Sequence, residues 1–210
     1  MRAGDEAIAF DGRGAQFRIR LIAAGKRGVR VEVLEPVPPQ PEPPLPITLA
    51  QGLCRREKMD WVIQKATELG VARIVPVITE RSVARLDSGR SEKRLTHWRA
   101  VIAHACEQCG RSVMPSVDPA VGIGDFLESH EQQYTGIVLD PDATQSLAKI
   151  DAAPIGLTLL TGPEGGLTSA ELDTAVHAGF SRAAIGPRTL RTETAALAGI
   201  ALVQARWGDL

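Results

Sequence analysis

The amino-acid sequence predicts an α/β fold, in which a small β domain precedes a larger domain built on a parallel sheet. From residue 47 onward, short apolar runs alternate with segments whose apolar side chains recur at helical spacing, as in parallel sheets joined by helices. Before residue 36 the pattern is of short strands and turns. Seven prolines in residues 36–46 separate the two patterns. We therefore expect a β domain over 1–36, a stiff linker over 37–46 and an α/β domain over 47–210.

Composition sets the broad class of the protein. A chain of 210 residues that is 44% hydrophobic and 23% charged is typical of a globular protein. No apolar run reaches the length of a membrane span, and the N-terminus lacks the basic-then-apolar pattern of a signal peptide. These features indicate a cytoplasmic protein without a membrane partner.

Cysteine and histidine give little support for a disulfide scaffold or a metal site. The three cysteines are an odd number, and Cys106 and Cys109 fall in a helical pattern without a second such pair. His97 and His104 share a helix face but have no further metal-ligand partner there. We expect helix packing for the cysteine pair and no bound metal.

The net charge of −1 does not by itself indicate a nucleic-acid partner. Basic side chains are nevertheless unevenly spread, with one cluster at residues 55–58 and a basic stretch beyond residue 80. That stretch contains Arg81, Arg85, Arg90, Lys93, Arg94, Arg99 and Arg111. Either a solvated helix face or an RNA contact explains such a stretch.

Three strands are predicted in the first domain. They are EAIAF, then QFRIRLI after an Asp11–Gly12 turn, then VRVEVL after a turn at residues 25–28. Phe17, Ile19 and Leu21 alternate with arginines, the period of a half-buried strand. Three strands are too few for a stable barrel. Hence the three strands either pack against the rest of the chain or belong to a barrel whose upstream strands are missing.

Strands and helices alternate in the second domain. Strands are predicted at PITLAQGL, VARIVPVIT, TGIVLD, IGLTLL and AAIG. Helices are predicted over about 59–69, ended by Gly70, over about 91–110, and over the last 18 or so residues. The last helix is apolar almost all round, which is typical of a buried or interface helix.

Ligands of open α/β sheets bind beyond the carboxyl ends of the strands. Three predicted loops lie there: one at Asp140–Pro141, one over 161–167 and one over 187–194. In the middle loop, GPEGGL leads into a capping box formed by Thr168 and Glu171. The loop has neither the G-x-G-x-x-G pattern nor the lysine of a P-loop. Its glycines permit close backbone approach, so a flat base and ribose is favoured over a phosphate, with a ligand-free tight turn as the alternative.

The third loop, GPRTLRTETA, brings two arginines close to Glu193 at the start of the last helix. Thr192 or Thr194 is expected to cap that helix. The arrangement indicates either a capped helix with surface arginines or a paired arginine–acid site that includes Arg188 and Arg191.

Four stretches together resemble one known family. They are REKMDWVIQKATELGVARIVPVITERS, ACEQCGR, LTGPEGGLTSAEL and GPRTLRTETAAL. They are similar to the ribosomal RNA small subunit methyltransferase E family of the SPOUT superfamily, and the resemblance covers essentially the whole chain. It implies an N-terminal PUA-like β-barrel that holds RNA, a SPOUT-type parallel sheet with a C-terminal trefoil knot, and a homodimer. The chain starts in what looks like the middle of the barrel domain, so we expect a partial barrel.

The resemblance also implies an activity. It is the S-adenosyl-L-methionine-dependent methylation of N3 of a uridine, conventionally numbered 1498, in 16S ribosomal RNA of the 30S subunit. The alternatives are a non-catalytic RNA-binding assembly factor with the same fold and a nicotinamide-dependent α/β enzyme. The missing G-x-G-x-x-G motif speaks against the last.

Site residues follow from the same resemblance. The expected cofactor-binding residues are Leu139, Asp140, Leu160, Gly162, Glu164, Gly165, Gly166, Ile185, Gly186, Leu190, Arg191 and Thr192. The expected RNA-binding residues are Arg55, Arg56, Lys58, Glu107, Gln108 and Arg111. For catalysis, Arg191 would stabilise the uracil anion, and Glu193 or Glu164 would remove the N3 proton. Arginine also suits phosphate clamping, so Arg191 could instead position RNA.

Overall fold

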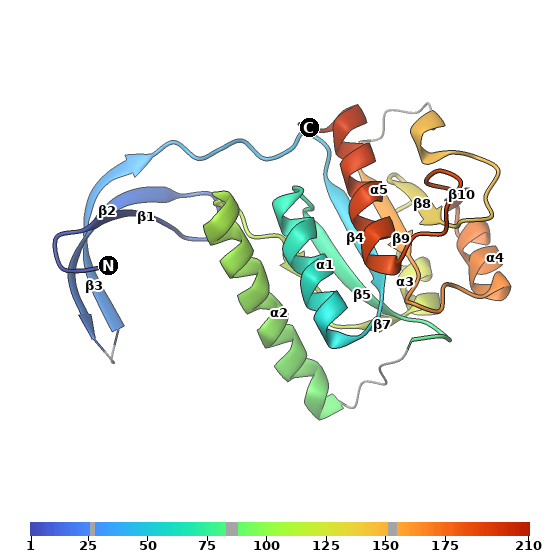
Figure 1. The fold of residues 1–210 in the computed structure, drawn as a ribbon, viewed down its shortest axis with the longest axis horizontal. Helices are drawn as coiled ribbons and strands as arrows, with labels where there is room; N and C mark the ends of the chain where they lie inside the picture. Colours follow the sequence, from blue (N-terminus) through green and yellow to red (C-terminus); the bar gives the residue numbers. More distant parts are fainter. Residues whose placement is uncertain (26–27, 83–87, 151–154) are drawn as a thin grey trace.

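The computed structural model describes residues 1–25, 28–82, 88–150 and 155–210 (Figure 1). Residues 26–27 of the predicted turn, Arg85 and the side chain of Arg90 lie outside the described part of the structure. The elements, in chain order, are β1 (Glu6–Phe10), β2 (Gln16–Gly25), β3 (Gly28–Val37), β4 (Ile47–Gly52), α1 (Arg56–Glu68), β5 (Arg73–Ile78), α2 (Ser88–Cys109), β6 (Ser116–Val117), β7 (Val121–Gly122), α3 (Ile123–Glu128), β8 (Thr135–Leu139), the 3-10 helix η1 (Leu147–Lys149), β9 (Leu157–Thr161), α4 (Ser169–His177), β10 (Ser181–Ala183) and α5 (Thr192–Trp207).

A parallel sheet forms the centre of the larger domain. Its strand order is β10-β8-β9-β4-β5-β6, and β7 also pairs with β5. Leu49 of β4 lies opposite Leu159 of β9 on one side and Ile74 of β5 on the other. The predicted parallel sheet is therefore confirmed, with β4 and β9 in its middle.

Helices cover both faces of this sheet (Figure 1). One core contains Leu49, Leu159 and Ile74 and packs beneath α1, α2 and α5. The other core, which includes Ala50 and Leu160, lies beneath α3 and α4. Neighbouring residues of one strand thus face opposite cores, which is why the strands read as continuous apolar runs. None of the described helices is long and apolar enough to cross a membrane.

The N-terminal residues form a separate antiparallel sheet of order β1-β2-β3, which stands to one side of the parallel sheet in Figure 1. It touches the larger domain where Gly12 and Val113 form a bridge and where the Gly14 amide donates to the Ser112 carbonyl. The linker that follows β3 is also packed, because the Glu42 carboxylate pairs with the Arg111 guanidinium.

Several elements differ from the sequence prediction. The short elements β6, β7, α3 and η1 are not foreseen, and β10 begins at Ser181 rather than Ala183. No side chain caps α5, so the predicted cap by Thr192 or Thr194 is wrong. The Thr192 hydroxyl instead donates to the Gly162 carbonyl oxygen. The capping box of α4 is confirmed, since Thr168 and Glu171 bond each other's backbone amides.

Candidate functional site

A cavity of about 530 Å³ lies at the carboxyl ends of β8 and β9. The loops after β8, β9 and β10 all contribute to it, as predicted for ligands of parallel sheets. Nine of the predicted cofactor-binding residues line it: Leu139, Asp140, Gly162, Glu164, Gly165, Gly166, Leu190, Arg191 and Thr192.

The other three predicted cofactor-binding residues lie elsewhere. Ile185 lines a smaller hollow that adjoins the cavity and shares Leu139 and Leu190 with it. Gly186, with φ +66°, lies outside both linings. The Leu160 side chain is fully buried in the core beneath α3 and α4. A side-chain contact from Leu160 to a ligand is therefore excluded, and only its backbone remains available.

The loop over 162–167 is held in a tight path between β9 and α4. The Gly166 amide donates to the Pro163 carbonyl at 2.9 Å, and Gly166 has φ +70°, which favours glycine. A Cβ on Gly162 would lie 2.9 Å from the backbone nitrogen of Leu167, and one on Gly52 would lie 2.5 Å from the nitrogen of Pro163. The chain needs these glycines because backbone packs directly on backbone here.

A buried polar network joins this loop to the start of α5. The Gln51 side chain, fully buried in β4, accepts a hydrogen bond from the Thr161 hydroxyl at 2.7 Å. Its amide nitrogen donates to the Thr192 hydroxyl at 3.0 Å, and Thr192 donates to the Gly162 carbonyl at 2.6 Å. Residues 51, 161 and 192 are therefore tied to one another although they are far apart in sequence.

Asp140 anchors the loop that follows β8. Its carboxylate is buried and pairs with Arg182 of β10, with an Oδ2–Nη2 distance of 2.5 Å. Its other oxygen accepts the Asp142 amide at 3.1 Å. This side chain thus fixes one wall of the cavity and has its charge compensated from β10.

A lysine lies between the two predicted base candidates. The Lys58 Nζ atom, in the first turn of α1, is 3.7 Å from Glu164 and 3.4 Å from Glu193. The Glu164 Oε1 atom also accepts the Arg55 amide at 3.1 Å. The predicted pairing of Glu193 with an arginine is wrong in the described residues, because its ion-pair partner is Lys58.

Sequence reasoning did not single out Arg81 as a pocket residue. It follows β5, lines the cavity, and donates from Nη1 to the Gly165 carbonyl at 2.9 Å. The preceding amide, of Glu80, donates to the Glu171 carboxylate at 2.8 Å. The position of Arg81 just beyond the carboxyl end of a strand is the signal that could have identified it.

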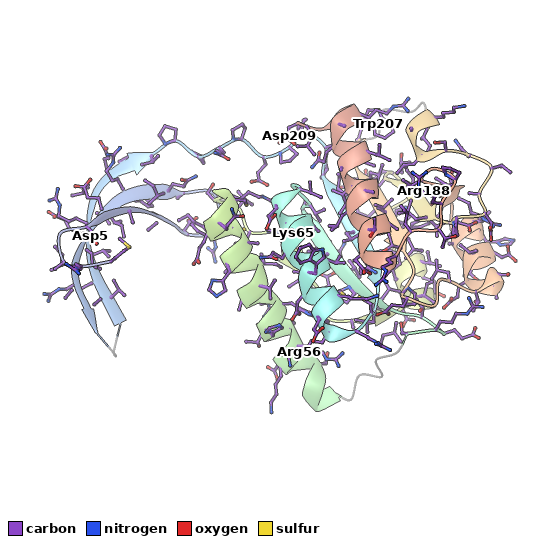
Figure 2. The ribbon with its side chains drawn as sticks, viewed as in Figure 1. Asp5, Arg56, Lys65, Arg188, Trp207 and Asp209 are labelled. Carbon is purple, nitrogen blue, oxygen red and sulfur yellow. The ribbon has the colours of Figure 1, made fainter. Side chains whose placement is uncertain are left out.

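The predicted RNA-binding residues do not form one cluster. Arg55 and Arg56 are exposed at the start of α1, and Arg56 is labelled in Figure 2. Glu107 and Gln108 are exposed in the last turn of α2. Arg111 is only 8% exposed, and its guanidinium donates to Glu42 and to two backbone carbonyls. This burial argues against an RNA contact by Arg111, which instead joins the linker to α1 and the turn after it.

The cysteines are all free. Burial raises the pKa of Cys54 to about 12 and that of Cys106 to about 11, so both stay thiols at neutral pH. Within the described part of the chain, no three His, Cys, Asp or Glu side chains are grouped as a metal site requires.

Comparisons of the sequence and of the structure with known proteins point to the same family of RNA methyltransferases. Residues 41–204 match the RNA methyltransferase domain. The ribosomal RNA small subunit methyltransferase E of Mycobacterium bovis is 33% identical, over 99% of this chain and 82% of its own length. A putative methyltransferase from Legionella pneumophila, solved in complex with the cofactor SAM, has a TM-score of 0.95 at 34% identity, over all of this chain and 86% of that one.

A second solved structure agrees. The ribosomal RNA small subunit methyltransferase E of Neisseria gonorrhoeae, bound to S-adenosyl methionine, has a TM-score of 0.93 at 37% identity, over all of this chain and 86% of that one. These matches confirm the predicted fold class, a SPOUT-type parallel sheet preceded by a small β domain.

Proposed function

The chain belongs to the ribosomal RNA small subunit methyltransferase E family, and we propose that it methylates N3 of a uridine in 16S ribosomal RNA with S-adenosylmethionine as methyl donor. Two similar proteins, at 34% and 37% identity, are solved with this cofactor bound. The observation that carries the proposal is the cavity at the carboxyl ends of β8 and β9, which the family's loop residues line. The proposal implies a cytoplasmic protein that works on the small ribosomal subunit.

The residues of the cavity fit an adenosyl group. The loop over 162–167 presents backbone amides and carbonyls, and Leu139, Leu167 and Leu190 add apolar surface. Small-molecule sites generally combine these features. The negative charge of Asp140 is already compensated by Arg182, so the ligand does not need a positive charge at this wall of the cavity. When bound, S-adenosylmethionine supplies an electrophilic methyl group to the attacking nitrogen.

Arg191 is the proposed electrostatic stabiliser. It lines the cavity, is exposed, and forms no ion pair with any acid in the described residues. N3 of uracil carries a proton at neutral pH, so attack requires its removal and leaves negative charge on the ring. A guanidinium beside the uracil carbonyl oxygens would stabilise that charge.

Glu164 is the proposed base, and Glu193 is proposed as a positioning residue. Glu164 lines the cavity, whereas Glu193 does not. The Arg55 amide and Lys58 both contact Glu164 Oε1, which leaves Oε2 available to accept the N3 proton. Glu193 acts indirectly: its carboxylate lies 3.4 Å from the Lys58 Nζ atom and holds this lysine beside Glu164.

A homodimer is also proposed, with α1 and α5 at the interface. These helices pack side by side on one face of the sheet. Trp61 of α1 is 51% exposed and Leu202 of α5 is 38% exposed. Large exposed apolar side chains on adjacent helices are typical of an interface between subunits. Sedimentation velocity of the wild type and of Trp61→Glu tests this, because the variant should be monomeric; a dimeric variant would contradict the assignment.

Methyl transfer to purified 30S subunits tests the activity. With labelled S-adenosylmethionine, the label should appear on N3 of one uridine. RNA binding without transfer would favour the non-catalytic assembly factor and overturn the proposal.

The variant Glu164→Gln separates two roles of this side chain. Its amide oxygen can still accept the Arg55 amide, so the loop should keep its path and cofactor affinity should stay within about threefold. Turnover should fall by about 10²–10⁴, the usual contribution of a positioned base. Unchanged turnover would remove Glu164 as the base, and Glu193→Gln then becomes the variant to compare.

A further inference from the structure

A second cavity, of about 290 Å³, opens between the first turn of α1 and α2. We call it the α1–α2 cavity. Its floor is apolar and includes Leu53, Met59 and Trp98, each at most 4% exposed. Its rim is basic and includes Arg56, Lys93 and Arg94. None of these six residues lines the cavity described above.

The rim carries positive charge that the described residues do not compensate. Arg56, Lys93 and Arg94 form no ion pair within the described part of the chain. The nearby acid Asp60 is already bonded to His97, at 2.8 Å. An anionic ligand is therefore favoured at the rim.

The floor favours a ligand with a flat apolar part. Burial, the largest cause, raises the pKa of Cys54 to about 12, so this lining residue is a neutral thiol. The floor thus carries no charge, and it lies next to a rim of cations. A nucleotide has the matching chemistry, since its base is flat and its phosphate is anionic. Nucleic-acid sites commonly combine a positive groove with such an apolar surface for the base.

The first turn of α1 contributes lining residues to both the α1–α2 cavity and the larger cavity. Arg56 and Met59 line the α1–α2 cavity, whereas Lys58 lines the larger one. Arg55, between Cys54 and Arg56, donates its amide to Glu164. A single strand that places one uridine in the larger cavity can therefore reach the other with a nearby nucleotide.

We propose that the α1–α2 cavity binds a nucleotide of the substrate RNA close to the methylated uridine. The apolar floor receives the base, and Lys93, Arg94 and Arg56 contact its phosphates. This inference rests on the proposed function, because it takes the same RNA as ligand. An RNA ligand is favoured over a protein segment because the rim is entirely basic and adjoins the site where RNA would react.

RNA affinity of rim variants tests the proposal. Binding of a fluorescein-labelled single-stranded RNA with a central uridine is measured by anisotropy over a salt series, for wild type, Lys93→Ala, Arg94→Ala and the double variant. The logarithm of the association constant falls linearly with the logarithm of the salt concentration, and each lost phosphate contact should make this slope shallower by about 0.7. The double variant should bind about tenfold more weakly. Lys149→Ala, which removes an exposed lysine of η1, is the matched control and should bind like wild type.

Photocrosslinking locates the nucleotide directly. RNA with 4-thiouridine beside the central uridine should crosslink to the peptide that contains Met59 or to the one that contains Trp98. Double-variant affinity and salt slope equal to those of Lys149→Ala would overturn the proposal. The proposal would also be overturned if the double variant lost the dimer in sedimentation velocity while its RNA affinity stayed unchanged. That result would make the cavity a protein interface. The binding and crosslinking results do not depend on turnover. If the wild type bound RNA through the rim but did not methylate 30S subunits, the proposed activity would be refuted and the proposed nucleotide site would stand.

Discussion

Removing the Thr192 hydroxyl should weaken both the fold and the cofactor site. In Thr192→Val the side chain keeps nearly the same shape but loses its donation to the Gly162 carbonyl, at 2.6 Å, and its acceptance from Gln51, at 3.0 Å. Two net hydrogen bonds are worth about 1–3 kcal/mol. Gln51 can still donate to the Gly52 carbonyl at 3.0 Å, so we expect a loss of about 2 kcal/mol. For a chain of this length that lowers the Tm by about 4–8 °C.

The same substitution should raise the Kd for S-adenosylmethionine about tenfold, or about 1.4 kcal/mol, since the hydroxyl ties the loop over 162–167 to the start of α5. Chemical denaturation measures the stability and isothermal titration calorimetry the affinity. Thr194→Val is the control, because Thr194 is exposed on the same helix. If valine at 192 left the affinity unchanged while stability fell, the network would support only the fold. If neither changed, the reasoning would be refuted.

Further predictions concern close packing, buried charge, catalysis and pH. Gly162→Ala, whose Cβ would lie 2.9 Å from loop backbone, should cost about 1–3 kcal/mol and weaken cofactor binding in calorimetry; unchanged affinity would count against the loop's role. Arg111→Met should cost about 1–3 kcal/mol in denaturation, because it removes the ion-pair partner of Glu42 and the donor to the Thr67 and Val71 carbonyls. RNA affinity should stay unchanged; weaker RNA binding would show that Arg111 contacts RNA. Arg191→Ala should lower turnover about a hundredfold, and a fall in cofactor affinity alone would make it a pocket residue. Burial raises the folded-state pKa of Cys54 to about 12 and that of Cys106 to about 11, above the ordinary value for a cysteine thiol, so both should resist thiol reagents at pH 8. Stability should fall as pH rises from about 9 towards 11–12, since only the unfolded thiols ionise at first; flat stability over that range would contradict their burial.

The sequence identifies β4, β5, β8, β9 and β10 of the parallel sheet and the carboxyl-end loops because these features are local. A strand buried on both faces reads as a continuous apolar run, and a capping box reads as Thr168 and Glu171 at fixed spacing. Nine of the twelve predicted cofactor residues line one cavity for the same reason, since parallel strands bring their carboxyl ends to one edge.

Long-range partners could not be predicted in the same way. Nothing in the stretch around Gln51 reveals that its amide bonds Thr192, 141 positions further on. The helix begins at Thr192 itself, with Arg191 at the N-cap position, and the Thr192 hydroxyl donates to the Gly162 carbonyl of a loop that is distant in sequence. Arg111 lies in a family motif and carries a charge, so it was expected at the RNA. Its burial against Glu42 depends on the path of the proline-rich linker, which local patterns do not define.

The path of the glycine-rich loop explains why it holds a glutamate. Glu164 must reach the Arg55 amide at the start of α1, while the backbone on either side of it faces the cavity. Gly162 permits the close approach before it, and Gly166 supplies the positive φ after it. The carboxylate therefore fixes the loop to α1 through one oxygen and leaves the other for chemistry. In this arrangement the loop geometry and the proposed proton transfer depend on a single side chain. Glutamine at this position should keep the loop geometry and remove the proposed proton transfer.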